Sequence, residues 1–280
     1  MISKKLFSTK DKQKMKRKLN SITLPTLDTP PLDSLVNFRT NTYWGVADRE
    51  KFKSLMDEVV KLVSPGFHLS DNLFTWSRNN SLFEDKTFLK SWKSNIQNPS
   101  DEAIAWRRYI LATSAHHAIH LEGDFVECGV YLGTGVKVVC DYLGSDIFPK
   151  TFWAYDTYDF NPVDGHRFEN QKDGLFEKVK LRFKDYPQVK IIKGLIPDAF
   201  KDNCPEKIAY LHIDLNNASS EIATLDFLFD RIVPGGMVIL DDYEWSGFYR
   251  PQKLEEDAWF HKRQYRIMPL PTGQGLIIKR

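Results

Sequence analysis

The chain has no long run of apolar residues. None of its hydrophobic stretches approaches the roughly 18 residues that a membrane-spanning helix requires. The N-terminus is rich in lysine, and no apolar stretch follows it as one does in a secretory signal peptide. Internal repeats and low-complexity segments are missing as well. These absences argue against a helical membrane protein and against a repeat array, so we expect no membrane span.

Cysteine is scarce. The three cysteines, Cys128, Cys140 and Cys204, cannot all pair within the chain, and their spacing is not that of a metal site. A disulfide scaffold and a zinc module are therefore not expected, and the reducing cytoplasm is the expected location. Hydrophobic residues make up 42% of the 280 residues and charged residues 27%, which is ordinary for a globular protein.

Charge is unevenly distributed along the chain. The net charge is +2, but residues 1–20 hold eight basic residues and one acidic residue, which leaves −5 for the rest. Such a like-charge block is usually a solvated tail, and an anionic partner such as nucleic acid or a phosphorylated glycolipid is the alternative. Only Phe7 interleaves with the lysines, so no stacking platform for single strands is present. This pattern argues against a nucleic-acid-binding role.

Three segments follow one another along the chain. Residues 1–34 form a basic arm and a proline-rich linker. Residues 35–120 form a helical N-terminal or lid region, with helices predicted over 52–63 and 100–121 from apolar periodicity and an acidic first turn. Between these helices, residues 67–98 are rich in aromatic side chains but lack a clean period. Residues 121–280 have a different pattern and form a separate predicted domain.

Short apolar runs alternate with helical patterns through that last segment. We predict strands at 125–130, 151–156, 189–194, 208–214 and 237–242, helices at 135–143, 176–183 and 222–232, a turn at 234–236, and final strands at 265–268 and 275–279. Strands that are almost continuously apolar are typical of a parallel sheet that is covered on both faces. The fold class is therefore predicted to be α/β, with a doubly wound sheet and an N-terminal helical extension.

A glycine-rich turn follows the first predicted strand. Its pattern is Glu127-x-Gly129-x-x-x-Gly133-x-Gly135, which differs from the dinucleotide fingerprint and would also suit a purely structural tight turn. Asp156 ends the next strand, where it can accept hydrogen bonds from a ribose diol. The turn has no basic residue to hold a pyrophosphate, so a nucleoside without phosphates fits better. S-adenosylmethionine is such a ligand. Glu127 would bind its positively charged methionine end directly, or would act indirectly by stabilising the loop.

Three aspartates end two further strands. Asp214 follows the strand at 208–214, and Asp241 and Asp242 follow the strand at 237–242, so their carboxylates should meet at one edge. They would repel one another unless they were protonated or neutralised by a cation. Oxygen ligands suit Mg²⁺, which could hold two vicinal hydroxyls and lower the pKa of one of them. The alternative is that each aspartate caps a turn or a helix.

Several segments together resemble one enzyme family. The segments GDFVECGVYLGTG, YDTYDF, HIDLNNASSE, VPGGMVILDDYEW and LPTGQGLIIK are similar to the macrocin-type (TylF/MycF) sugar O-methyltransferases, and residues 120–280 resemble the class I methyltransferases. The resemblance implies a Rossmann-like seven-stranded sheet, a homodimer, and metal binding at Asp214, Asp241 and Asp242. With the glycine turn, it also implies a set of residues that bind S-adenosylmethionine: Glu127, Gly129, Tyr131, Gly133, Thr134, Gly135, Asp156, Gly194 and Asp214.

The chain departs from the family at one catalytic position. Family members have a D-G-D run whose second acid is the proposed general base, whereas this chain has Asp214-Leu215-Asn216. The Asn216 amide cannot take up a proton at neutral pH. We therefore place catalysis at Asp214 and Asn216 and consider His166, His212 and Tyr243 as substitute bases. His166 lies in a loop that a substrate could reach, whereas His212 lies within an apolar strand and is more typical of the core.

Other conspicuous residues are assigned to structure. His116, His117 and His120 share a helix, but without a suitable acid nearby they indicate a surface or packing role rather than a metal site. Trp76, Arg78 and Tyr43 are weak candidates for substrate contacts from the lid region.

The sequence thus favours a metal-assisted, S-adenosylmethionine-dependent O-methyltransferase that acts on a sugar or sugar-like hydroxyl of a small molecule or glycan. Two alternatives stay open: methylation of an amine or a non-sugar hydroxyl, and a methyltransferase-like binding protein without turnover. A nucleotide-dependent oxidoreductase is less well supported, because it would need the shorter glycine spacing.

Overall fold

A seven-stranded sheet forms the centre of the computed structural model, which describes residues 35–145, 148–158 and 174–280. The strand order is β6-β5-β4-β7-β8-β10-β9. The strands are β4 (Asp124–Cys128), β5 (Phe152–Asp156), β6 (Val189–Lys193), β7 (Ile208–Ile213), β8 (Ile232–Leu240), β9 (Met268–Pro269) and β10 (Gly275–Ile278). The pairs from β6 to β8 are parallel, and β10 is antiparallel to both β8 and β9. The predicted α/β doubly wound fold is confirmed.

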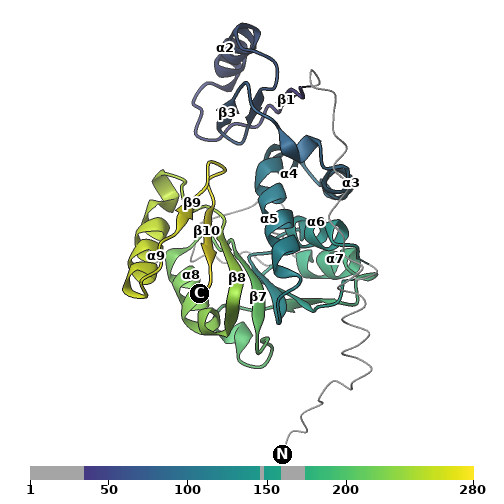
Figure 1. Cartoon of the computed structure of the whole chain (residues 1–280), viewed down its shortest axis with the longest axis vertical. Coiled ribbons are helices and arrows are strands. Elements are labelled where there is room, and N and C mark those ends of the chain that lie inside the picture. The colour runs from purple at the N-terminus through teal and green to yellow at the C-terminus, as the bar shows by residue number, and fades with distance from the viewer. Residues whose placement is uncertain (1–34, 146–147, 159–173) are drawn as a thin grey trace, which may run out of the picture.

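Helices cover both faces of this sheet (Figure 1). They are α5 (Ala105–Ala118), α6 (Thr134–Tyr142) and α7 (Leu175–Arg182) on one face, and α8 (Ala218–Leu228) and α9 (Arg250–Lys262) on the other. Successive strand residues serve opposite faces, as in β4, where Phe125 packs in the core under α5 and α6 and Val126 packs in the core under α8 and α9. This two-sided burial explains the continuous apolar runs.

The region before α5 combines helices with a small sheet. Its elements are β1 (Phe38–Arg39), α2 (Arg49–Leu62), β2 (His68–Ser70), β3 (Leu73–Thr75), α3 (Lys86–Asn95) and α4 (Pro99–Ala103). The three strands pair in the order β1-β2-β3. We call residues 35–75 the N-terminal module; in Figure 1 it lies beyond one end of α5, away from the helices that flank the large sheet. Short 3₁₀ turns occur at Ser81–Phe83, Asp198–Phe200, Phe229–Arg231 and Gly247–Tyr249.

Three expectations about elements were wrong. The helix predicted over 100–121 is broken at Ile104 into α4 and α5. The turn predicted at 234–236 lies within β8, because Ile208 pairs with Ile232 and Tyr210 pairs with Met237, so the residues between Ile232 and Met237 bulge out of the ladder. The strand predicted over 265–268 is reduced to Met268–Pro269.

Two features fall outside what the structure describes: the basic arm with its linker (residues 1–34) and the loop that contains His166. Within the described ranges, no helix is both long and apolar enough to cross a membrane.

Candidate active site

Gly129 brings the turn after β4 against the end of β7. Its φ is +91°, and a Cβ atom there would lie 1.8 Å from the backbone oxygen of Asp214, so only glycine fits. The Gly129 N–H donates to the Tyr155 oxygen at 2.9 Å, and the Asp214 N–H donates to the Cys128 oxygen at 2.8 Å. The ends of the three central strands are thereby tied together around the turn.

The rest of the turn leads into α6. Gly133 has φ +77° and leaves room for the Phe183 ring, whose Cε2 would lie 2.4 Å from a Cβ atom. Gly135 in the first helical turn faces the Glu127 carboxylate, which would lie 3.0 Å from its Cβ. Thr134 is buried, and its hydroxyl donates to Asp101 at 3.1 Å, while Tyr131 adopts a positive φ of 48°. The predicted cofactor turn is therefore built at the helix N-terminus.

Asp156 organises this turn. One carboxylate oxygen accepts the N–H groups of Val130 and Tyr131, each at 2.7 Å, and the other accepts the Tyr158 N–H at 2.7 Å. Gly194 donates to the Asp156 backbone oxygen at 3.1 Å. Asp156 thus lies beside the turn as predicted, and its bonds to the loop were not anticipated. Its role toward a ribose stays a prediction.

His212 lies between two carboxylates and has no solvent exposure. Its Nδ1 lies 3.1 Å from Glu127 as an ion pair, and its Nε2 lies 3.3 Å from Asp241. Burial alone would lower the pKa of His212, but Glu127 and Asp241 outweigh it and raise the pKa to about 10. The side chain is therefore an imidazolium, which cannot act as a general base, and Glu127 supports the turn through this pair.

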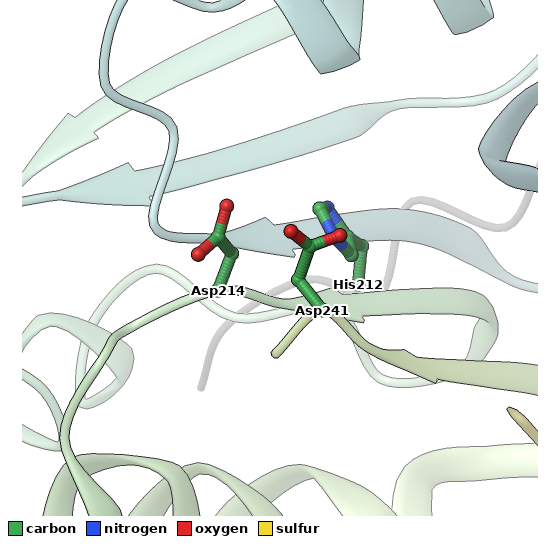
Figure 2. A group of neighbouring side chains, drawn as sticks. All are labelled: His212, Asp214 and Asp241. Atoms are coloured by element: carbon green, nitrogen blue, oxygen red, sulfur yellow. The ribbon is translucent and has the colours of Figure 1, made fainter. Parts of the chain in front are cut away.

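Asp214 and Asp241 point the same way from neighbouring strands, with His212 beside them (Figure 2). Ligand atoms of these three residues lie within 4.8 Å of one another. Burial and the charges of Asp241 and Asp242 raise the pKa of Asp214 well above its usual value. For Asp241, burial is outweighed by Arg107 and His212, which lower its pKa, whereas burial raises the pKa of Asp242 to about 6.

Arg107 on α5 neutralises the two aspartates after β8, a role that was not predicted from the sequence. It is 6% exposed, and its Nη1 lies 2.9 Å from both Asp241 and Asp242. Its other nitrogens hold Asp71 at 2.7 and 3.0 Å. The available signal was a pair of arginines in the otherwise largely uncharged run from Ala103 to Leu111. An arginine side chain in such an apolar helix is expected to be partly buried and therefore to pair with an acidic residue.

The donor set suits a hard cation only in part. Asp214 and Asp241 offer carboxylate oxygens within reach of one ion, as Mg²⁺ prefers. Asp242 is outside that close group of donors and is bonded to Arg107 instead. Asp241 also accepts a hydrogen bond from Gln274 at 2.8 Å. The residues fit a divalent ion if Arg107 gives up its bonds to the pair.

The remaining candidates are dispersed. The Asn216 amide donates to Asp214 at 3.3 Å, so it orients that carboxyl. Tyr243 donates to Asp257 on α9, which turns its hydroxyl toward the helix rather than toward the aspartates. Tyr43 is buried against Phe52 and belongs to the packing of the N-terminal module. The His116 ring lies edge-on to the rings of His117 and His120, and the latter two side chains are exposed, as expected for a helix-surface role.

A family model described as Macrocin-O-methyltransferase (TylF) matches residues 111–252, just over half of the chain. The chain belongs to this family. The match covers the glycine turn, Asp156 and all three aspartates, so the resemblance drawn from the sequence is confirmed.

Curated relatives carry related names. The chain is 28% identical over 141 residues to a demethyldecarbamoylnovobiocin O-methyltransferase of Streptomyces niveus, covering 44% of this chain and 54% of the relative. It is 26% identical over 140 residues to a mycinamicin III 3''-O-methyltransferase of Micromonospora griseorubida, covering 43% and 55%. The chain thus spans about half the length of the curated relatives it matches.

Solved structures share the fold. The O-methyltransferase NovP superimposes with a TM-score of 0.54 at 18% identity, over 70% of this chain and 89% of that one. The calicheamicin methyltransferase CalS11 gives 0.51 at 14% identity, over 72% and 94%. These similarities establish the methyltransferase fold of the sheet.

Proposed function

We propose that this protein is an S-adenosylmethionine-dependent O-methyltransferase that acts on a sugar or sugar-like hydroxyl of a small molecule or glycan. The observation that carries the proposal is the arrangement of Asp214 and Asp241 at the carboxyl edge, directly beside the Gly129 turn, in a chain of this family. The three relatives that support a sugar acceptor are named for novobiocin, mycinamicin and rhamnosyl-tetracenomycin substrates. A cytoplasmic homodimer belongs to the same proposal.

The methyl donor would lie over the turn formed by Gly129, Gly133 and Gly135. The backbone of this turn approaches the end of β7 with no side chain between. The turn itself contains no arginine or lysine, and Arg182 beside it donates to the Leu132 oxygen, the Thr134 hydroxyl and the Asn95 oxygen. This favours a nucleoside with a sulfonium tail over a dinucleotide. Asp156, which lies beside the turn and accepts three backbone N–H groups, is the residue proposed to hold the ribose diol.

Asp214 is the proposed general base. Its carboxylate is half-buried at the end of β7 beside Asp241, and burial together with the charges of Asp241 and Asp242 raises its pKa. When the acceptor oxygen attacks the methyl carbon in line, the carbon–sulfur bond breaks and the hydroxyl proton passes to Asp214. Asn216 keeps the Asp214 carboxyl in place. Mg²⁺ held by Asp214 and Asp241, with Asp242 beside them, would lower the pKa of the hydroxyl when it is bound.

Calorimetric titration of S-adenosylmethionine and its demethylated product, with Mg²⁺ and with EDTA, tests the donor. Micromolar binding of both would support the proposal and justify a screen of glycosides by mass spectrometry for the gain of one methyl group. In that screen Asp214→Asn should lose turnover, and the exposed Asp198→Asn should keep it. No binding of either ligand would reject the proposed function.

Two outcomes would favour the alternatives. Methylation of amines or phenols without metal would indicate a non-sugar acceptor. Donor binding with no turnover on any acceptor, and no effect of Asp241→Asn, would indicate a protein that keeps the fold for binding alone.

A further inference from the structure

Arg107 joins two parts of the molecule that are far apart in the chain. Its Nε and Nη2 hold both oxygens of Asp71, and its Nη1 holds Asp241 and Asp242, each at 2.9 Å. The Trp245 ring lies 5.1 Å from the guanidinium carbon and adds a cation–π contact. One buried cation therefore serves three carboxylates.

Asp71 belongs to the tight turn between β2 and β3. Asp71 and Asn72 have positive φ values of 52° and 56°, as a two-residue hairpin turn requires. The Trp44 indole donates to Asp71 at 3.0 Å, and Asn72 exchanges hydrogen bonds with the backbone of Trp44. The turn is thus a fixed part of the N-terminal module, and Arg107 fastens that module to the carboxyl edge of the large sheet.

We propose that the Arg107 guanidinium and a divalent cation are alternative counter-ions of Asp241 and Asp242. Nη1 already lies against an oxygen of each aspartate, and a Mg²⁺ ion held by Asp214 and Asp241 would need an oxygen of Asp241 at about 2.1 Å. Two cations a few ångströms apart in a buried site repel strongly. Binding of the metal therefore requires Nη1 to withdraw, whereas the His212 imidazolium keeps Glu127 as its own counter-ion. This inference rests on the divalent ion of the proposed function and is independent of the acceptor.

Asp71 makes the exchange feasible. A guanidinium that lost all its partners inside the protein would be strongly destabilising. Because the guanidinium is planar and rigid, Nη1 leaves the aspartates only when the whole group tilts, and the Asp71 side chain tilts with it to keep its two bonds to Nε and Nη2. The N-terminal module thereby takes up the cation that the metal displaces.

The two partners of Arg107 predict opposite effects on metal affinity. Titration of the full-length chain with Mg²⁺, in the absence of methyl donor, should show Arg107→Met binding at least ten-fold more tightly than the wild type, because the competing cation is gone. Asp71→Asn should bind Mg²⁺ several-fold more weakly, because a displaced Arg107 would lack a charged partner. Arg263→Met removes an exposed arginine that pairs with Asp226 and should leave the affinity unchanged.

Other results would overturn the inference. Equal or weaker Mg²⁺ binding by Arg107→Met, or no binding by any variant, would show that the two cations do not compete. If Arg107→Met fails to fold, Arg107→Lys and Asp71→Asn test the inference instead. Their melting temperatures are measured with and without Mg²⁺. Mg²⁺ should raise the melting temperature of Arg107→Lys more than that of the wild type, and that of Asp71→Asn less. Donor binding is measured separately, so failure of the proposed function remains distinguishable from failure of the competition.

Discussion

At Gly129 the turn after β4 and the end of β7 approach each other more closely than any side chain allows. Gly129→Ala should therefore destabilise the protein by about 3 kcal/mol or more, because it adds a backbone clash to a disfavoured φ. Unfolding in urea measures this loss. Gly247→Ala is the matched control, because it also has a positive φ, +66°, but nothing lies within 4 Å of its Cβ; its cost should be about 1 kcal/mol. Equal losses for the two variants would contradict the close approach.

His212 provides the second test at the scale of single residues. His212→Gln should lower the free energy of unfolding by about 3–5 kcal/mol, because it leaves the buried carboxylates of Glu127 and Asp241 without their shared cation. Urea unfolding at neutral pH measures the change. The double variant Glu127→Gln/His212→Gln should regain part of the loss, while the exposed His117→Gln should be nearly neutral. A silent His212→Gln would show that the imidazole is not charged.

At the scale of elements, α8 and α9 are joined through two buried carboxyl groups. Glu221 on α8 and Glu256 on α9 have no exposure, and the Leu215 N–H donates to Glu221 at 3.2 Å. Burial raises the pKa of Glu256 to about 7, and burial together with the charge of Glu256 raises that of Glu221 well above its usual value. Burial therefore favours the proton-bound form of this pair.

This pair predicts how stability changes with pH. An unfolded glutamate has a pKa of about 4.3, so between that pH and about 7 the folded state holds more protons than the unfolded state, and stability falls as pH rises. Glu256→Gln should make that fall shallower, because only Glu221 then keeps a raised pKa, and should make the protein about 2–3 kcal/mol more stable than the wild type at pH 8, with little difference at pH 4.5. Urea unfolding across this range is the measurement, and the exposed Glu255→Gln is the control. A parallel pH dependence of Glu256→Gln and wild type would contradict the raised pKa of Glu256.

Elements differed in how well the sequence predicted them. β4, β5 and β7 were recognised because both of their faces are buried, which produces unbroken apolar runs. The edge strand β6 kept an apolar centre in Ile191 and Ile192 although its two lysines are exposed. α9 was missed because its buried side chains include Gln252 and Glu256 beside Trp259 and Phe260, so no apolar period marks its inner face. The strand through Pro234 was interpreted as a turn because the bulge in β8 depends on its pairing with β7.

At the scale of the whole molecule, the site joins segments that only the folded chain brings together. Asp214, Asp241 and Asp242 were predicted from the sequence, because strand ends in a parallel sheet meet at one edge. Arg107, which neutralises the last two, was not predicted, because it lies 134 residues from Asp241 and 36 residues from Asp71 in the sequence. The spacing of residues in the sequence does not predict a contact between Arg107 and these aspartates.

Ligand binding should stabilise the molecule as a unit. At a concentration of the demethylated donor 100 times its dissociation constant, the free energy of unfolding should rise by about 2.7 kcal/mol. Thermal melting of the full chain measures this rise, and adenosine triphosphate is the control, because the glycine turn holds no basic residue for phosphates. A larger rise with the triphosphate would reassign the turn to a phosphorylated ligand.

The helix α2 has a further consequence for the dynamics of the molecule. Not one of its 14 residues is buried, and its attachments include the Asp48 cap, which accepts the Lys51 N–H, and the ion pair of Arg39 with Asp57. A helix of this length is marginal in water without tertiary packing. Its amide hydrogens should therefore exchange with deuterium through local opening, well before those of β4 and β7, whose exchange should require global unfolding. Equal protection of α2 and the central strands would show that the N-terminal module opens only together with the sheet.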